Sequence, residues 1–202
     1  KIKEQTAQVS FYGMGVDIAD VNNDMLQDIF VLDMAASDHV RSKTLMASMN
    51  EQRFNMLTED MGFQHQYMFN SLQLNRGNGR FDNVVHQAHM AKTDWSWAGL
   101  IADLDNDADR DVYVTNGYRR YALDNDLQNQ VRETQRAFNG TVPLDVKQKL
   151  YDAMPTEKLS NIAFINNGDL DFKNNSYQWG LAVASYSNGG AYADLDNDGD
   201  LE

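Results

Sequence analysis

The sequence predicts an all-β fold with α-helical insertions, and three observations lead to this prediction. A loop with carboxylates at every second residue occurs three times. A segment rich in Asn and Gly, with extended flanks, occurs twice at a fixed distance from such a loop. The segments between these β units carry apolar residues at helical spacing. The chain therefore looks like a series of repeated β units that are decorated by helices.

Length and composition set limits on the class of protein. The chain has 202 residues, of which 42% are hydrophobic, and this is enough for one sizeable domain. The net charge of -13 argues against a nucleic-acid partner, because a phosphate-binding surface needs clustered Lys and Arg. The absence of Cys excludes disulfides and thiolate metal sites but leaves the compartment open. No apolar run approaches the roughly 20 residues of a membrane span.

The first acidic loop, "DIADVNNDMLQD" over residues 17–28, lies between the strand-like runs "GVDIAD" and "IFVLDM". Helical spacing then predicts a helix over Val40–Met61, with Ser37 or Asp38 as cap and Gly62 as stop. The apolar positions that predict it are Leu45, Met49, Phe54, Leu57 and Met61.

A hairpin is predicted next, because "LQLNRGNGRFDNV" has Gly and Asn at its centre between extended flanks. The second acidic loop, "IADLDNDADRD" over residues 101–111, again joins two strand-like runs, "GLIAD" and "VYVTNG". Two helices should follow it. One covers Asp124–Phe138 and ends at Gly140, and the other covers Pro143–Met154 with Thr141 as cap and Pro143 in its first turn.

The second and third units share one register. "NSLQLNRGNGRF" aligns with "NIAFINNGDLDF" at an offset of 91, and the same offset carries Asp103 onto Asp194. The first acidic loop precedes the second by 83 residues. The predicted repeat units are 11–37, 65–118 and 159–202. The two helical insertions between them are 38–62 and 122–155.

The spacing of the acidic side chains predicts calcium sites. Side chains at loop positions 1, 3, 5 and 9, with a backbone carbonyl at position 7, supply the six or seven oxygens that Ca²⁺ prefers. Magnesium and zinc suit such a loop less well. The predicted ligands of the three loops are Asp20, Asn22, Asp24, Leu26 and Asp28; Asp103, Asp105, Asp107, Asp109 and Asp111; and Asp194, Asp196, Asp198, Asp200 and Glu202.

Two alternatives compete with this interpretation. An EF-hand is rejected, because position 12 is Val31 or Val114 in a predicted strand and not the required Glu before a helix. Asx-turns without metal would also explain a single loop. Three loops in matched register favour the metal.

The quoted loops lie within three longer segments: "GMGVDIADVNNDMLQDIFVLDM", "TDWSWAGLIADLDNDADRDVYVTNGYRR" and "SNGGAYADLDNDGDLE". These segments resemble the FG-GAP/VCBS repeat proteins, especially large surface proteins of Bacteroidetes that are found with an ASPIC/UnbV domain. The resemblance implies a calcium-stapled β-propeller of the integrin-α type, exported or lipid-anchored at the cell surface. It implies no reaction. The fold class expected from it is a partial β-propeller, an internal piece whose ring is completed by further blades outside these residues.

Two departures from the family pattern matter for the predicted sites. The family has Gly at position 6, where a positive φ is expected; Gly199 keeps it, whereas Met25 and Ala108 replace it. Glu202 also stands where the family has Asp at position 9. We rank the second loop strongest by charge and the first weakest, because the first has Asn22 and no Gly.

Other candidate residues have simpler explanations. His86 and His89 lack an evident third ligand and are expected at the surface. Trp95 and Trp97 could form a platform for a sugar ring, although packing between β units is the favoured interpretation. Arg119 and Arg120 could belong to a ligand-binding loop or to a solvated turn.

The expected function is that of an extracellular, calcium-binding surface scaffold that binds a protein partner or serves adhesion. The alternative from another class is a surface glycan-binding accessory protein for nutrient uptake. A hydrolase is less favoured, because no nucleophile motif is present and an enzyme is not expected.

Overall fold

The computed structural model describes residues 2–44, 51–121 and 124–201. Strands hold 29% of the chain and helices 22%, so the protein consists mostly of β-sheets with a few helices, and one sheet curls into a half-barrel. The all-β prediction is therefore confirmed in this coarser form. The propeller stays a prediction.

The first large sheet contains the first acidic loop. Its four strands are β2 (Gly15–Ala19), β3 (Asp28–Leu32), β6 (Ser71–Asn75) and β7 (Phe81–Asn83). They pair in the order β2-β3-β6-β7, and all the pairs are antiparallel. The acidic loop connects β2 to β3, and the predicted hairpin forms β6 and β7. Both sequence predictions are confirmed.

The second large sheet repeats this arrangement around the second acidic loop. Its strands are β8 (Asp94–Ala102), β9 (Asp111–Asn116), β11 (Ile162–Asn166) and β12 (Phe172–Asn174). The short strand β4 (Met34–Ala35) is added beside β8, which gives the order β12-β11-β9-β8-β4. Each sheet therefore takes its outer hairpin from the sequence that follows a helical insertion, so a sheet combines strands from two consecutive sequence repeats.

The remaining strands form two small sheets of two strands each. In the first, β1 (Val9–Ser10) pairs parallel with β5 (Gln66–Tyr67). In the second, β10 (Leu159–Ser160) pairs antiparallel with β13 (Ala184–Ser185). A short helix, α1 (Ile2–Gln5), precedes them at the start of the described chain.

The hydrophobic core lies between the two large sheets. Phe30, Leu32 and Leu72 come from the first sheet, and Val112 and Val114 from the second; each of them is fully buried. The inner strands approach closely, because a Cβ atom on Gly15 of β2 would lie 2.3 Å from the Trp97 carbonyl oxygen of β8. A larger residue at this position would push the sheets apart.

The first insertion contains α2 (His39–Thr44), α3 (Glu51–Asn55) and the π-helical turn η1 (Met56–Asp60). Asp38 is the cap, since its Oδ1 accepts a hydrogen bond from Arg41 N at 2.8 Å. Gly62 has a left-handed φ of 68° beyond the last turn, as the predicted stop requires. Leu45 and Met49, which contributed to the predicted helix, lie outside the described residues.

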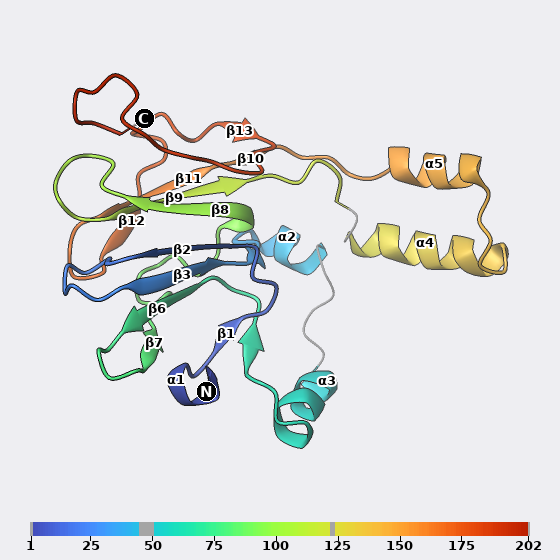
Figure 1. The fold of residues 1–202 in the computed structure, drawn as a ribbon. Helices are drawn as coiled ribbons and strands as arrows, with labels where there is room; N and C mark the ends of the chain where they lie inside the picture. Colours follow the sequence, from blue (N-terminus) through green and yellow to red (C-terminus); the bar gives the residue numbers. More distant parts are fainter. Residues whose placement is uncertain (1, 45–50, 122–123, 202) are drawn as a thin grey trace.

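The second insertion is a helical hairpin that projects from the sheets in Figure 1 and contains α4 (Asn125–Ala137) and α5 (Leu144–Asp152). Asp124 caps α4 through a bond from Leu127 N. The predicted start of the last helix was wrong: Pro143 itself is the N-cap residue, without a side-chain cap bond, so Thr141 is not the cap. Pro143 has an extended ψ of 153°, which places it just before the helix.

Arg41 joins the bases of the two insertions. Its guanidinium forms a salt bridge with Asp94 at 2.7 Å, donates to the Tyr121 hydroxyl at 3.0 Å and pairs with Glu157. It also lies 4.9 Å from the centre of the Tyr121 ring. Both insertions are therefore fixed to the start of β8. No helix in the described part of the chain has the length and apolar character needed to cross a membrane.

Candidate metal sites

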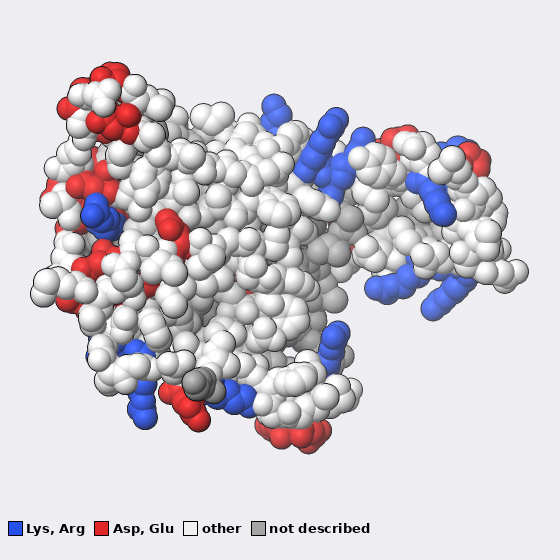
Figure 2. All heavy atoms as spheres, in the orientation of Figure 1, with Lys and Arg blue, Asp and Glu red and all other residues white. Residues whose placement is uncertain are grey.

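The three acidic loops lie one above another along the same edge of the molecule, the left edge in Figure 1. The first loop precedes β3, the second precedes β9, and the third lies at the end of the described chain. Positions 1 to 9 are counted from Asp20, Asp103 and Asp194. Figure 2 shows Asp and Glu side chains gathered along this edge, opposite the projecting helices. The edge is therefore the most acidic part of the face in that view.

The residue at position 1 organises each loop. In the first loop the two carboxylate oxygens of Asp20 accept from Asp24 N at 3.1 Å and from Met25 N at 2.7 Å. Its equivalents also accept two backbone bonds each; the bond from position 6 is common to all three loops, whereas in the third loop the other bond comes from position 4 and not from position 5. Asp103 accepts from Asp107 N and Ala108 N at 3.1 and 3.0 Å, and Asp194 from Asn197 N and Gly199 N at 2.6 and 3.1 Å.

The residue at position 5 continues the turn. Its Oδ1 atom accepts from the backbone N–H at position 7 in every loop, with distances of 2.9 Å for Asp24, 2.8 Å for Asp107 and 3.0 Å for Asp198. This is the local Asx bonding that aspartate favours. The same chain path is thus produced three times from one pattern of side chains.

Positive φ angles complete the turn at positions 4 and 6. At position 6 Met25, Ala108 and Gly199 have φ values of 68°, 75° and 101°, which confirms the expected conformation. The two non-glycine residues there carry the steric cost of a left-handed backbone, about 1 kcal/mol each. Position 4 is also left-handed, and it is Asn each time: Asn23, Asn106 and Asn197, at 57°, 61° and 62°.

The residue at position 9 ties the first two loops to a hairpin from the same sheet. Asp28 is fully buried and accepts from Val21 N at 3.0 Å and Asn75 N at 2.8 Å. Asp111 is equally buried and accepts from Leu104 N and Asn166 N, both at 2.9 Å. In the third loop this position is Glu202, which lies outside the described residues.

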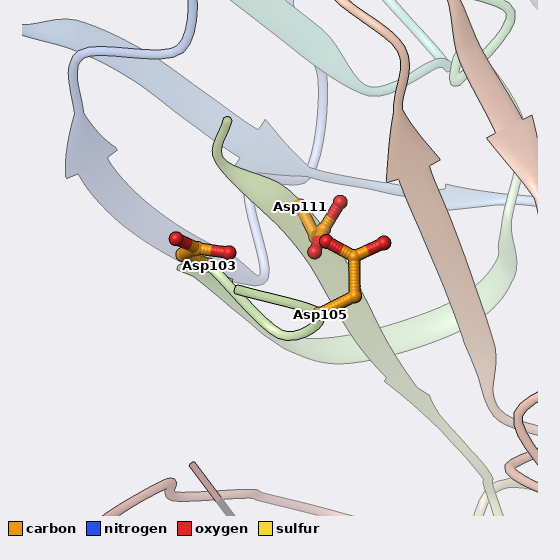
Figure 3. A group of neighbouring side chains, drawn as sticks. All are labelled: Asp103, Asp105 and Asp111. Atoms are coloured by element: carbon orange, nitrogen blue, oxygen red, sulfur yellow. The ribbon is translucent and has the colours of Figure 1, made fainter. Parts of the chain in front are cut away.

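Among the described residues, two groups of three carboxylates converge closely enough to hold a metal ion. In the second loop these are Asp103, Asp105 and Asp111, each offering an oxygen within 4.8 Å of the others. Figure 3 shows the carboxylates of Asp105 and Asp111 facing one another across the loop. The second group is Asp194, Asp196 and Asp198, all exposed to solvent.

The crowding of the carboxylates affects their protonation. Burial raises the pKa of Asp111 to about 6, helped by the negative charges of Asp105 and Asp107, while the bonds from Asn166 N and Leu104 N act in the opposite direction. Desolvation raises the pKa of Asp105 as well, together with the charges of Asp107 and Asp103. The pKa of Asp28 is also raised, first by burial. A bound cation would favour the ionised form of each of these groups.

The structure separates some predicted ligands from these groups. In the first loop Asn22 Nδ2 donates to Asp24 at 3.0 Å, and the part of the chain that is described places no three carboxylates together there. Asp107 is absent from the group in its own loop. Leu26, Asp109 and Asp200 lie at position 7, where the predicted ligand is the backbone carbonyl oxygen and the side chain is left for other contacts.

Sequence reasoning missed the asparagine at position 4. Asn23 Nδ2 donates to the Asp109 carboxylate at 2.7 Å, and Asn106 Nδ2 donates to the Asp200 carboxylate at 2.6 Å. Each bond links one loop to the next. The signal was present in the sequence, because Asn recurs at this position in all three loops.

The other candidate residues are placed as their simpler explanations predict. His86 and His89 are exposed. Trp95 is buried and stacks on Tyr118 with ring centres 4.4 Å apart, and Trp97 donates from its indole nitrogen to the Gly117 carbonyl.

The two arginines separate from one another. Arg119 is exposed. Arg120 lies over the ring of Tyr151 at 4.4 Å and donates to the carbonyl oxygen of the same residue at 3.0 Å. This pair of contacts fixes Arg120 against α5.

The described loops offer oxygen donors, with neither imidazole nor thiolate among them, and such a donor set is typical of a hard divalent cation. No protein-family model and no protein of curated function matches this chain.

Proposed function

We propose that this chain is part of an extracellular, calcium-stabilised β-propeller of the FG-GAP/VCBS kind, which serves as a binding or assembly scaffold at the cell surface. The observation that carries the proposal is the repeated bonding of the loops. Three segments that are far apart in sequence adopt one turn, in which positions 1 and 5 hold the backbone and carboxylates remain at the loop centre. Like charges brought so close together favour a bound cation.

Calcium fits these loops better than the smaller magnesium ion. The donors are carboxylate and carbonyl oxygens on a mostly exposed turn, and Ca²⁺ tolerates six to eight ligands in irregular geometry. Mg²⁺ requires a tight octahedron and keeps its water. The predicted set is up to three ions, with the second and third loops favoured because their carboxylates converge.

Apolar residues are exposed on the outer face of the first sheet, and this favours the proposal that further blades pack against it. Val16 and Ile18 of β2 are 62% and 55% exposed, whereas Phe30 and Leu32 on the inner face are fully buried. A neighbouring blade would cover the outer residues.

The opposite side of the two large sheets also has room for a neighbouring blade. A cavity of about 380 Å³ lies beside the second sheet, lined mainly by Leu100, Tyr113, Trp179 and Tyr192. We infer that it receives a strand of the next blade.

The location proposed for the protein follows from affinity. Extracellular calcium modules bind at about 10⁻⁴ to 10⁻³ M, and loops without a bidentate Glu should bind no more tightly. Free ion at roughly ten times Kd stabilises by about 1.4 kcal/mol per site, so three sites would contribute about 4 kcal/mol. This is a large part of the 5 to 15 kcal/mol typical of a domain. Cytosolic calcium is too scarce to fill such sites.

A protein or adhesion partner is favoured over a glycan bound at the tryptophan pair. A sugar platform needs an open aromatic face, and Trp95 is 6% exposed beneath Tyr118. A hydrolase would need an open acid outside the loops. Asp33 is the buried candidate, but its oxygens accept from the backbone N–H groups of Phe11, Tyr12 and Met34.

The test is a thermal melt of the chain in millimolar calcium, in magnesium and in EGTA. We expect the midpoint to rise in calcium and to rise less in magnesium. A midpoint that is the same in calcium and EGTA would contradict the calcium staple. Protease accessibility on intact cells tests the surface location separately, since a surface protein is cleaved without lysis.

A further inference from the structure

Neighbouring acidic loops are joined by a side-chain hydrogen bond that occurs twice, and the first pair of loops has a second, longer bond from Asn23 Nδ2 to the Ala108 carbonyl oxygen at 3.4 Å. Asn23 of the first loop donates to Asp109 of the second at 2.7 Å, and Asn106 of the second donates to Asp200 of the third at 2.6 Å. In both cases the donor is at position 4 of one loop and the acceptor at position 7 of the next. A contact that recurs at equivalent positions of two loop pairs is a property of the repeat.

The donor side chain of this bond lies between two predicted ligands. Asn106 is flanked by Asp105 and Asp107, and Asn23 by Asn22 and Asp24. Their left-handed φ angles, 61° and 57°, are a conformation that Asn adopts more readily than most residues. A cation that fixes positions 3 and 5 would therefore also fix the asparagine between them.

The acceptor is connected to the next loop in the same way. Asp200 N donates to the Asp198 carboxylate at 3.0 Å, and Asp109 N donates to the Asp107 carboxylate at 2.8 Å. Residue 7 is thus bonded to the position-5 side chain of its own loop and to the asparagine of the preceding loop. Holding residue 7 in place orders the part of the loop that contains its predicted carbonyl ligand.

We infer that Asn23 and Asn106 are positioning residues that couple cation binding in neighbouring loops. The inference rests on the proposed function, because it requires that the loops bind calcium. An ion in one loop holds its asparagine, so the next loop loses less conformational freedom when its own ion binds. Linkage makes the effect reciprocal, so calcium in the third loop also favours calcium in the second.

The bonds between loop side chains all run in one direction, from position 4 of one loop to position 7 of the next. Position 7 of the first loop is Leu26, which has no carboxylate to accept a bond. In the third loop the side-chain amide of Asn197 makes no hydrogen bond with the described residues. The second loop contributes a donor to one pair and an acceptor to the other, so it should be affected by changes on either side.

Three glycine substitutions test the coupling. Asn106→Gly removes one bond between loops and Asn23→Gly removes two, whereas Asn197→Gly removes an equivalent side chain that has no such bond with the described residues. All three positions have φ near 60°, which glycine adopts without strain. The three variants therefore differ in the bond that is lost and share the same backbone change.

The measurement is hydrogen exchange followed by mass spectrometry at increasing calcium, with peptides that report each loop separately. For Asn106→Gly we expect the calcium midpoints of the second and third loops to rise about two- to ten-fold, the factor that corresponds to one hydrogen bond. Asn23→Gly should raise the midpoints of the first and second loops. Asn197→Gly should leave all three unchanged.

The outcomes distinguish the coupling from the calcium sites themselves. If no loop of the unaltered chain gains protection in millimolar calcium, both the proposed function and the coupling fail. If the loops bind calcium but Asn106→Gly gives the same midpoints as Asn197→Gly, the coupling alone is overturned. The same holds if Asn106→Gly lowers only the melting midpoint of the calcium-free protein, because that would be a purely structural effect.

The acceptor gives a second test with a conservative variant. Asp200→Asn retains a side-chain oxygen and should keep the coupling, whereas Asp200→Leu, which copies position 7 of the first loop, should abolish it. Both changes leave the backbone carbonyl in place. Equal calcium midpoints for these two variants would overturn the proposed coupling. Unchanged exchange of β6 in every variant serves as the control for the fold.

Discussion

The second and third acidic loops form the same turn but differ in the burial of their carboxylates. In both, the residue at position 1 accepts from backbone N–H groups and position 5 bonds to position 7. The second loop is also anchored by the buried Asp111, which accepts from Asn166 N of β11. In the third loop Asp194, Asp196 and Asp198 are all exposed. The turn is thus a local product of its own sequence, whereas its anchor requires a hairpin from elsewhere in the chain.

The largest effect that separates the two loops should come from Asp111→Ala. Without this carboxylate the N–H groups of Leu104 and Asn166 lose their buried acceptor, so we expect a loss of about 2 to 4 kcal/mol. The change Asp198→Ala, at the exposed position 5 of the third loop, should cost less than about 0.5 kcal/mol in the absence of calcium. Urea denaturation in EGTA measures both. Similar losses would show that the buried carboxylate of Asp111 contributes no more to stability than an exposed loop carboxylate.

A pH effect of similar or smaller size should follow from the same carboxylate. The pKa of Asp111 is raised by burial to about 6, above its ordinary value of 3.8. Between about pH 4 and pH 6 the folded protein therefore binds a proton that the unfolded chain has released, and this contribution to stability decreases as pH rises. It amounts to about 2 to 3 kcal/mol in calcium-free solution.

The matched variant for this prediction is Asp111→Asn, which has no proton to bind at this position. The difference in the free energy of unfolding between the original protein and Asp111→Asn should change between pH 4 and 6 and stay level above pH 6. Urea titrations at several pH values in EGTA give this difference. If this difference is independent of pH, the pKa of Asp111 is not raised in the folded protein.

In calcium, Asp107→Ala should lower the melting midpoint more than the surface change His86→Ala. The reason is that it removes a predicted ligand and the side-chain acceptor for Asp109 N. We expect about 1 to 2 kcal/mol for the loop variant, close to the mass-action stabilisation from one site. Thermal melts in millimolar calcium and in EGTA give the comparison. Equal midpoints for the two variants would argue against a staple in the second loop.

The smallest effect should come from exchanging the residues at position 6. Gly199→Ala places a side chain at a φ of 101° and should cost about 1 kcal/mol. Ala108→Gly relieves a φ of 75° but adds conformational freedom to the unfolded chain, so a gain of at most about 0.5 kcal/mol is expected. The comparison needs precise denaturation curves. A stabilising Gly199→Ala would mean that the third loop does not keep this turn in solution.

Local features of this fold could be predicted from the sequence. The strands around the first two loops, the hairpin at β6 and β7 and the left-handed backbone at position 6 all follow from nearby residues. The cap at Asp38 and the end of α4 near Gly140 follow in the same way. The start of α5 was placed wrongly because Pro143 can occupy the N-cap as well as the first turn.

Contacts between distant segments could not be read in this way. The alignment of the repeats identified Asn75 with Asn166, and each donates its backbone N–H to the position-9 carboxylate before it. Nothing in the alignment tells which partner such a residue has, since the partner is 47 or 55 positions away. The bonds from Asn23 and Asn106 depend on how the sheets stack, and periodicity does not contain this information.

The position of Trp95 has a consequence for optical experiments on this protein. This buried indole lies at the start of β8, eight residues before Asp103, which corresponds to about 26 Å along an extended strand. Its emission should report exposure of the aromatic cluster when the protein unfolds and should be almost insensitive to ordering of the second loop. Trp179 belongs to the third unit and lines the cavity together with Leu104 and Tyr192. In a Trp179→Phe variant the remaining emission would therefore report global unfolding. The emission of Trp179 itself, obtained as the difference from the original protein, would report the part of the molecule where the third loop lies.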